Sequence, residues 1–425
     1  MQRGTRMLSL FATTVRSSCF VLLLAATPAL AQQRTLAADD FVRQVLEQGL
    51  DARIAALEIE AAAAERAGAG RWPNPSIEWT RESFGDGTDE SEDFFIASIP
   101  LVLSGRLGLE RDAADGEVQA AQARYERARA ALRRRATVAY FRVVEARQRV
   151  AVFERSLQEV RELERMLAAR AAAGDAAGYD SLRMGVERAT VENALGEARV
   201  RLAAATSEAE RLLPPGRKLP VLDATLAPEA VPADRDELLA ALEARRADLR
   251  ALRLEAEAAE ALAAAAGRSW IPDPTITGGA KVQDLGSAEV ETGYVVGLSV
   301  PLPFFERRQG TRALAEVRRR QAEARRAALL HAARSALAAA IETAASRAAR
   351  VQGARDGMLD PARELQVSAT AAYRAGGADI VTLVDAERTR REAELAFLDL
   401  ALAARIAQTD LLFLAGAFDA AAGAP

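Results

Sequence analysis

The spacing of apolar residues along the chain alternates between a helical and an extended period. Residues 39–69 and 105–213 carry apolar positions three and four residues apart, which predicts long amphipathic helices. The segment 73–103 between them alternates apolar and polar residues, which predicts two strands joined as a hairpin. Pro73 and Pro75 end the first helix, because proline lacks the amide hydrogen that a helix interior needs.

The same succession of helix, hairpin and long helices occurs again about 200 residues further on. The sequence therefore predicts two structural repeats, 32–213 and 234–416, joined by a proline-rich linker at 214–233. The matching motifs are Trp72-Pro73-Asn74-Pro75 with Trp270-Ile271-Pro272-Asp273-Pro274, Pro100-Leu101 with Pro301-Leu302, and Gly174 with Gly376-Gly377. The predicted parts of the second repeat are a helix, a strand hairpin at 272–303 and a helical hairpin at 306–416, followed by a C-terminal tail at 417–425.

The first residues have the layout of a cleavable secretory signal. Three arginines precede a short apolar run, and the small-residue site Ala29-Leu30-Ala31 follows it. We therefore expect residues 1–31 to be removed outside the cytoplasm, together with Cys19, the sole cysteine. The formal net charge of −4 becomes more negative when these arginines leave, which disfavours nucleic acid as a partner.

Candidate catalytic and metal-binding groups are scarce. The chain has one histidine, His331, and no glycine-framed serine, so it offers no nucleophile with a base and we do not expect an enzyme. His331 and the few methionines form no cluster suited to a soft or borderline metal, and no cofactor is expected. Charged residues make up 27% of the chain but are finely interspersed, as on solvated helices.

The four predicted strands decide the fold class. Each is about ten residues long, enough to cross a bilayer when tilted. A four-stranded sheet leaves two edges that lipid cannot satisfy, so other copies of the chain must close the barrel. Three copies give twelve strands and a lumen, whereas two give a barrel filled by side chains. We therefore expect a protein with helices and membrane β-strands, assembled as a trimeric 12-stranded barrel.

Four stretches of the sequence resemble the TolC-like outer-membrane efflux family, and within it the cobalt-zinc-cadmium-resistance type. They are 72–75, 100–106, 301–310 and the tip 373–387. The resemblance covers essentially the whole mature chain. It implies a homotrimer in outer-membrane lipid whose barrel continues into a long periplasmic helical barrel. It further implies two partners, a periplasmic adaptor (membrane fusion) protein and an inner-membrane resistance-nodulation-division pump. The chain would then be the passive outer-membrane channel of a tripartite efflux system, and the metal substrate is implied by the resemblance alone.

The resemblance also implies site residues. The family's gate has two acids three residues apart, and the corresponding positions here are Thr382 and Asp385, so one acidic ring is expected. An arginine that tethers this gate in the family is replaced by Ala378. Asp385 is alternatively a solvated acid in the first turns of a helix.

Two further sets of residues have a functional and a structural interpretation. Trp79 and Tyr294 are either an aromatic girdle of the barrel or buried strand aromatics. The expected adaptor-docking tips are the two glycine turns with their neighbours, although leucines at such positions are more often ordinary packing residues. The tip residues are Gly174, Asp180, Leu182, Gly376, Gly377 and Leu383.

A non-membrane alternative stays open at this point. A periplasmic coiled-coil adaptor or a coiled-coil scaffold protein would explain the helices. It would leave the repeated strand hairpins without a role.

Overall fold

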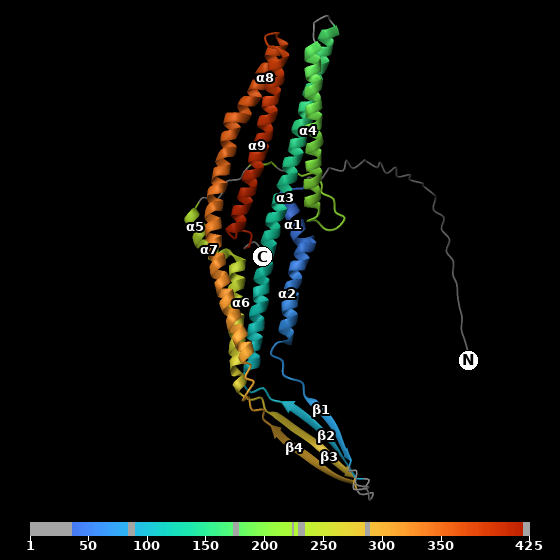
Figure 1. Cartoon of the computed structure of the whole chain (residues 1–425), viewed down its shortest axis with the longest axis vertical. Helices are drawn as coiled ribbons and strands as arrows, with labels where there is room; N and C mark the ends of the chain where they lie inside the picture. Colours follow the sequence, from blue (N-terminus) through green and yellow to red (C-terminus); the bar gives the residue numbers. More distant parts are fainter. Residues whose placement is uncertain are drawn as a thin grey trace, which may run out of the picture.

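The computed structural model of the chain describes residues 36–83, 90–172, 178–222, 225–227, 234–284 and 290–419. A four-stranded sheet lies at one end, and long helices run from it to the opposite end (Figure 1). The expected signal segment 1–31 lies outside the described residues. Within the described part, no helix has the length and apolar character needed to span a membrane.

The described residues of the first repeat form four helices and two strands. In chain order these are α1 (Ala38–Gln48), α2 (Leu50–Gly68), β1 (Ser76–Ser83), β2 (Ser91–Pro100), α3 (Arg106–Ala172) and α4 (Gly178–Glu210). The single helix expected over 39–69 is therefore interrupted at Gly49, which has an extended backbone. A Cβ atom at Gly49 would lie 2.4 Å from the carbonyl oxygen of Val45, so only glycine fits this break.

The second repeat follows the same order with one irregularity. Its elements are α5 (Arg235–Arg245), α6 (Ala247–Gly267), a 3₁₀ turn η1 (Arg268–Trp270), β3 (Thr275–Asp284), β4 (Val290–Ser299), α7 (Gln309–Ala354), a π-helix η2 (Arg355–Leu359), α8 (Asp360–Arg374) and α9 (Ile380–Leu414). Pro361 lies at the start of α8, directly after this π-helix. Proline cannot donate a helical hydrogen bond, and the wider π turn just before it accommodates the loss.

Helix α3 is the axis of the molecule. It has 67 residues, which corresponds to a length of about 100 Å, and it packs against α2, α4, α6 and α9. Its middle carries the main aromatic core, where the rings of Phe41 and Tyr140 lie 5.9 Å apart. The Tyr140 hydroxyl donates a hydrogen bond to the carbonyl of Leu36 at 2.7 Å, so this buried polar atom is satisfied.

The chain beyond α9 is docked and not a free tail over its described residues. Asp419 is buried, and its carboxylate accepts a 3.1 Å hydrogen bond from the backbone N–H of Ala247, at the N-terminus of α6. Arg127 of α3 pairs with the same carboxylate at 3.3 Å. The tail expected to begin at 417 therefore fastens α6 to α3 at this point.

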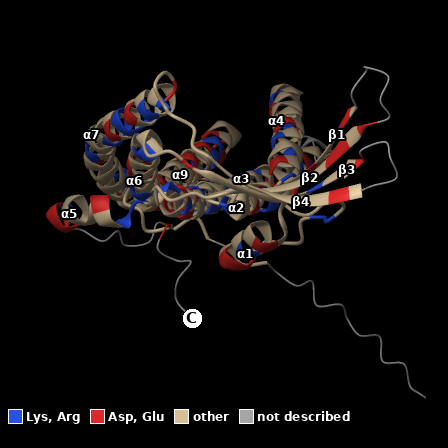
Figure 2. Ribbon diagram, turned by 90° about the horizontal axis from the view of Figure 1, so that it is seen from below, with Lys and Arg blue, Asp and Glu red and all other residues tan. Residues whose placement is uncertain are grey.

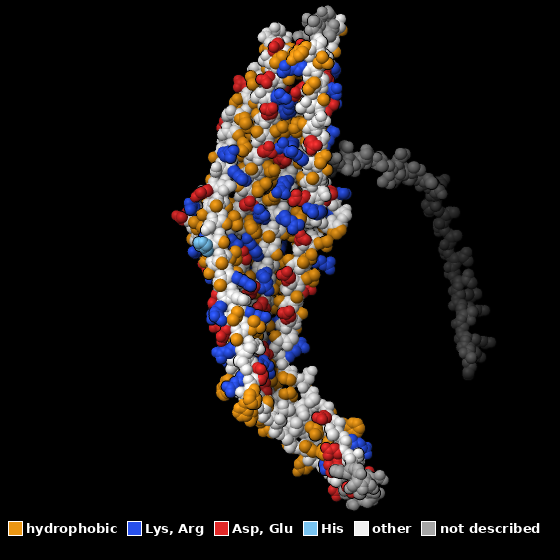
Figure 3. All heavy atoms as spheres, in the orientation of Figure 1, with side chains coloured by type: hydrophobic (Ala, Val, Ile, Leu, Met, Phe, Trp, Pro, Cys, Tyr) orange, Lys and Arg blue, Asp and Glu red, His pale blue; other side chains and the backbone are white. Residues whose placement is uncertain are grey.

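The four strands are antiparallel and lie in sequence order, β1-β2-β3-β4. Strands β2 and β3 join the two repeats in one sheet, and β1 and β4 form its two edges. Charged side chains of both signs are interspersed along the helices on the face shown in Figure 3, as the sequence predicts for solvated helices.

Candidate channel wall, gate and docking tips

The sheet has one apolar and one polar face. Cross-strand partners share a face, and the register places most of the large apolar strand residues on one side, whereas Phe94, Ile96 and Val295 lie on the other. Those that are exposed on this side are Ile77, Trp79, Phe95, Ile99, Ile276, Val290, Tyr294, Val296 and Leu298. A broad exposed apolar surface of this kind marks contact with another apolar phase.

Trp79 and Tyr294 lie in one row of this apolar face. Trp79 pairs with Phe95, Phe95 with Ala280, and Ala280 with Tyr294, so the row crosses the whole sheet. Tyr294 is 88% exposed on the single chain. The row crosses the strands near their middle.

The polar face of the sheet is predominantly acidic. Of the described strand residues, Glu78, Glu82, Glu92 and Glu291 lie on this face with one cation, Lys281. Lys281 pairs with Glu92 at 2.7 Å, which leaves a negative surplus. Figure 2 shows acidic residues at the outer ends of β1, β3 and β4.

A Schellman turn forms the second helical tip. The N–H of Gly377 donates to the carbonyl of Ala372 at 2.9 Å, and the N–H of Gly376 donates to Tyr373 at 3.1 Å. Gly376 has φ of +75°, a left-handed conformation that glycine adopts without a Cβ penalty. The glycine pair seen in the sequence therefore ends α8 and starts the return to α9.

The first turn of α9 contains Thr382. Asp379 is the N-cap, and its carboxylate accepts hydrogen bonds from the Thr382 hydroxyl at 2.6 Å and the Thr382 N–H at 2.8 Å. These two hydrogen bonds hold the pKa of Asp379 below its usual range. Thr382 thus has a capping role, and the sequence interpretation missed Asp379, although an aspartate three residues before a threonine is a recognisable cap signal.

Asp385 lies one helical turn after Thr382. Both residues are exposed, whereas Leu383 and Val384 beside them are buried. Asp385 therefore stands on the solvent side of α9, close to the tip. Leu383 is 2% exposed and packs in the core, so the structure does not place it on a docking surface.

The first tip carries an exposed apolar stripe at the start of α4. Gly174 lies outside the described residues, and Asp180 is half-buried. Leu182 is 75% exposed, and Tyr179 and Val186, one turn on either side, are exposed as well. The sequence interpretation selected Leu182 but missed its two neighbours, which the three- and four-residue spacing could have revealed.

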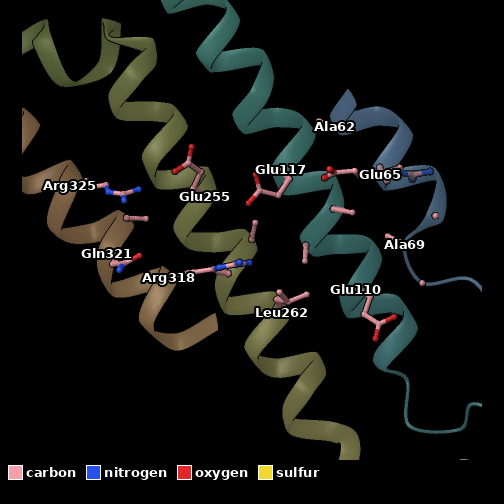
Figure 4. Close-up of a pocket in the computed structure, with 18 residues that line it drawn as sticks. Ala62, Glu65, Ala69, Glu110, Glu117, Glu255, Leu262, Arg318, Gln321 and Arg325 are labelled. Carbon is pink, nitrogen blue, oxygen red and sulfur yellow. The ribbon is translucent and has the colours of Figure 1, made fainter. Parts of the chain in front are cut away.

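A groove lies near the sheet end of the helices, between α2, α3, α6 and α7. Its volume is about 720 Å³, and alanines form much of its lining. Figure 4 shows Glu117 and Glu255 facing the space between α3 and α6, with Arg318 reaching across from α7. Burial, opposed by Arg124, raises the pKa of Glu117.

The groove does not resemble a metal centre. Among the described residues, no group of three or more histidine, cysteine, aspartate or glutamate side chains is arranged to hold a metal ion.

The sequence is similar to one protein family and to two characterised metal-resistance proteins. Residues 238–417 match the outer membrane efflux protein family. The chain is 28% identical over 336 residues to the cobalt-zinc-cadmium resistance protein CzcC of Cupriavidus metallidurans, which covers 77% of each chain. It is 28% identical over 276 residues to the nickel and cobalt resistance protein CnrC of the same organism, which covers 61% of this chain and 62% of CnrC.

Solved structures share the fold. The channel protein CusC superposes with a TM-score of 0.72 at 20% identity, over 89% of this chain and 91% of CusC. The Campylobacter jejuni outer membrane channel CmeC gives a TM-score of 0.73 at 15% identity, over 89% of this chain and 85% of CmeC. The family match, the sequence relatives and this shared fold agree with the resemblance found in the motifs, and residues 238–417 form an outer membrane efflux protein family domain.

Proposed function

We propose that this chain is one subunit of the outer-membrane exit channel of a tripartite efflux system. The observation that carries the proposal is the four-stranded sheet with an exposed apolar face, attached to helices long enough to extend far into the periplasm. Members of this family are outer-membrane channels and not enzymes, and they do not correspond to the adaptor alternative. The substrate would leave passively through the lumen.

The two sheet faces fit two different surroundings. In this proposal the apolar face contacts lipid and the acidic face lines the lumen, because lipid-facing strand residues are apolar and channel interiors are polar. Trp79 and Tyr294 then both face lipid. Their row runs across strands that tilt in a barrel by about 35–45°, so the two rings lie at different depths in the membrane.

Three copies of the chain would complete the barrel. The edges β1 and β4 carry backbone groups that need partners within lipid. Pairing β1 of one copy with β4 of the next satisfies both, and three copies give twelve strands with an open lumen.

The first prediction is that the mature protein is a trimer in detergent. Native mass spectrometry, or light scattering corrected for detergent, should give three times the chain mass as the main species. A stable monomer or dimer that retains the folded sheet would contradict the closed-barrel arrangement.

The helical tips would be the ends that face the pump. Both lie at the end of the molecule opposite the sheet (Figure 1). We infer that the stripe of Tyr179, Leu182 and Val186, with the turn at Gly376 and Gly377, contacts a periplasmic adaptor coupled to a resistance-nodulation-division pump. Apolar residues exposed at helical spacing are a usual site for docking another helix.

The gate would be formed by Asp385. In a trimer, three copies of this exposed residue near the tip would form one acidic ring, which favours cations and repels anions. Thr382 is uncharged and would add no second acidic ring. Its hydroxyl donates a hydrogen bond to Asp379.

The second prediction concerns this ring. Asp385→Ala should raise single-channel conductance in planar bilayers and weaken block by divalent cations added on the periplasmic side. The wild-type block should itself weaken at high salt, because exposed charges are screened. Glu392→Ala is the matched control, since Glu392 is exposed seven residues further along the same helix. Equal conductance and block in wild type and Asp385→Ala would place the constriction elsewhere.

The substrates are proposed to be divalent metal cations. The names of two relatives refer to cobalt, zinc and cadmium resistance and to nickel and cobalt resistance. The negative surplus on the proposed lumen face suits cation passage, because rings of carboxylates favour cations. Export assays with zinc, cobalt and cadmium salts test this assignment.

A further inference from the structure

A cluster of charged residues holds α9 against α3 near the tip. Arg390 of α9 is 6% exposed, and its Nη2 lies 2.5 Å from Glu159 Oε2 of α3. The same guanidinium contacts Glu387 Oε2 at 3.2 Å and Glu394 Oε2 at 3.3 Å, both on α9. One buried arginine therefore contacts three carboxylates, of which Glu387 and Glu394 are buried and Glu159 is partly exposed.

Every neighbouring helix adds charged or polar groups to this cluster. From α3, Arg155 pairs with Glu394 at 3.2 Å, and from α8, Arg363 pairs with the same carboxylate at 3.5 Å. Gln366 of α8 donates to Glu387 Oε1 at 2.5 Å. A second contact stands beside the cluster, where Arg391 donates to Ser156 and pairs with Glu187 of α4, which Arg388 also approaches.

Glu159 is the group that titrates here. Burial, and then the nearby carboxylate of Glu387, raise the pKa of Glu159 to about 7, although Arg390 and Arg155 oppose the rise. In the neutral form, the Glu159 carboxyl can donate a hydrogen bond to Glu387. In the charged form, Glu159 adds a third carboxylate to Glu387 and Glu394 around Arg390.

The hairpin of α8 and α9 has a structural means to move. The π-helix η2 lies at its base, and π-bulges are among the places where helices kink. A cavity of about 250 Å³ lies beside it, lined by residues of α3, η2, α8 and α9 that include Val152, Leu359 and Phe397. The groups that fasten α9 to α3 therefore lie next to a segment that can bend.

We propose that Glu159, Glu387 and Arg390 form a proton-dependent latch, which holds the α8–α9 hairpin against α3 when Glu159 carries a proton and loosens it when that proton leaves. The direction follows from linkage. A carboxyl whose pKa is higher in the docked state than in water stabilises docking at low pH, and this stabilisation is lost as the pH rises through the docked value of about 7. Undocking therefore releases a proton.

The size of the effect follows from the two pKa values. If undocking returns Glu159 from about 7 to its ordinary 4.5, the equilibrium constant for undocking should increase about tenfold between pH 6 and pH 8.

The test is amide hydrogen exchange of the assembled full-length channel in detergent, at pH 6 and pH 8 with correction for intrinsic exchange. In wild type, protection of peptides covering 380–398 should fall about tenfold over this interval. Glu159→Gln cannot ionise and keeps an N–H donor for Glu387, so its protection should stay at the pH 6 level at both pH values. Glu162→Gln, an exposed position on the same helix, should behave as wild type.

Three outcomes would overturn the latch. They are equal protection of wild type at both pH values, a Glu159→Gln variant that loses protection with pH as wild type does, and a Glu159→Gln variant unprotected at both. The measurement reports helix docking and not export, so it stands apart from the proposed channel function.

Discussion

Val296→Arg is expected to remove the protein from the outer membrane. Val296 is 77% exposed on the apolar face of β4, and its neighbours across the sheet belong to the same face. An arginine near the middle of a lipid-facing strand costs about 2–4 kcal/mol, and a trimer would carry this cost three times. Heat-resistant oligomers should therefore be lost from the outer-membrane fraction.

The adjacent residue supplies the control. Val295 precedes Val296 on the same strand but points to the acidic face, so Val295→Arg should still insert and form oligomers. Comparable amounts of both variants in the membrane would show that the apolar face does not contact lipid.

Leu182→Glu is expected to abolish metal resistance without disturbing insertion. Leu182 stands in the exposed stripe at the start of α4, so a charge there costs little stability but breaks an apolar contact with an adaptor helix. In a strain that lacks its own copy of the channel, growth on zinc, cobalt and cadmium should fall to the level without the protein.

Val200→Glu provides the comparison for this variant. Val200 is 64% exposed on the same helix but lies far from the tip, so its substitution should leave resistance near wild type. Normal resistance with Leu182→Glu, or equal losses in the two variants, would argue against docking at this tip.

The sequence predicted the repeated architecture because its signals are local. Proline elements bound the hairpins, and the glycine pair Gly376-Gly377 marks the turn before α9, which begins at Ile380. Gly49 was missed because one glycine within a helical pattern is usually tolerated. Its necessity comes from the close approach to the Val45 carbonyl, which only the folded backbone reveals.

The charged side of α9 could not be predicted from the sequence. Glu387, Arg390, Arg391 and Glu394 have the composition of a solvated helix face, and the burial of all four depends on α3, α4 and α8 packing around them. An apolar helix face can be recognised in the sequence without knowing its partner, because exposing apolar side chains to water is unfavourable. Charged faces are buried only where the partner supplies matching charges at the same height.

The two faces of the sheet could be predicted only in part from the sequence. The alternation of apolar and polar residues identified the strands. The register between the four strands decides which residues of each strand share a face of the sheet with those of the next strand. Strand β4 shows this clearly, because Val295 and Val296 are identical residues on opposite faces.

The docking of Asp419 bears on the order of events during biogenesis. Its carboxylate caps α6 and pairs with Arg127 of α3, so one contact joins the last described residue to both repeats. A chain still crossing the inner membrane would leave the N–H of Ala247 and the guanidinium of Arg127 without this partner. We therefore expect chains truncated before Asp419 to dock α6 on α3 less firmly and to be cut more readily by periplasmic proteases.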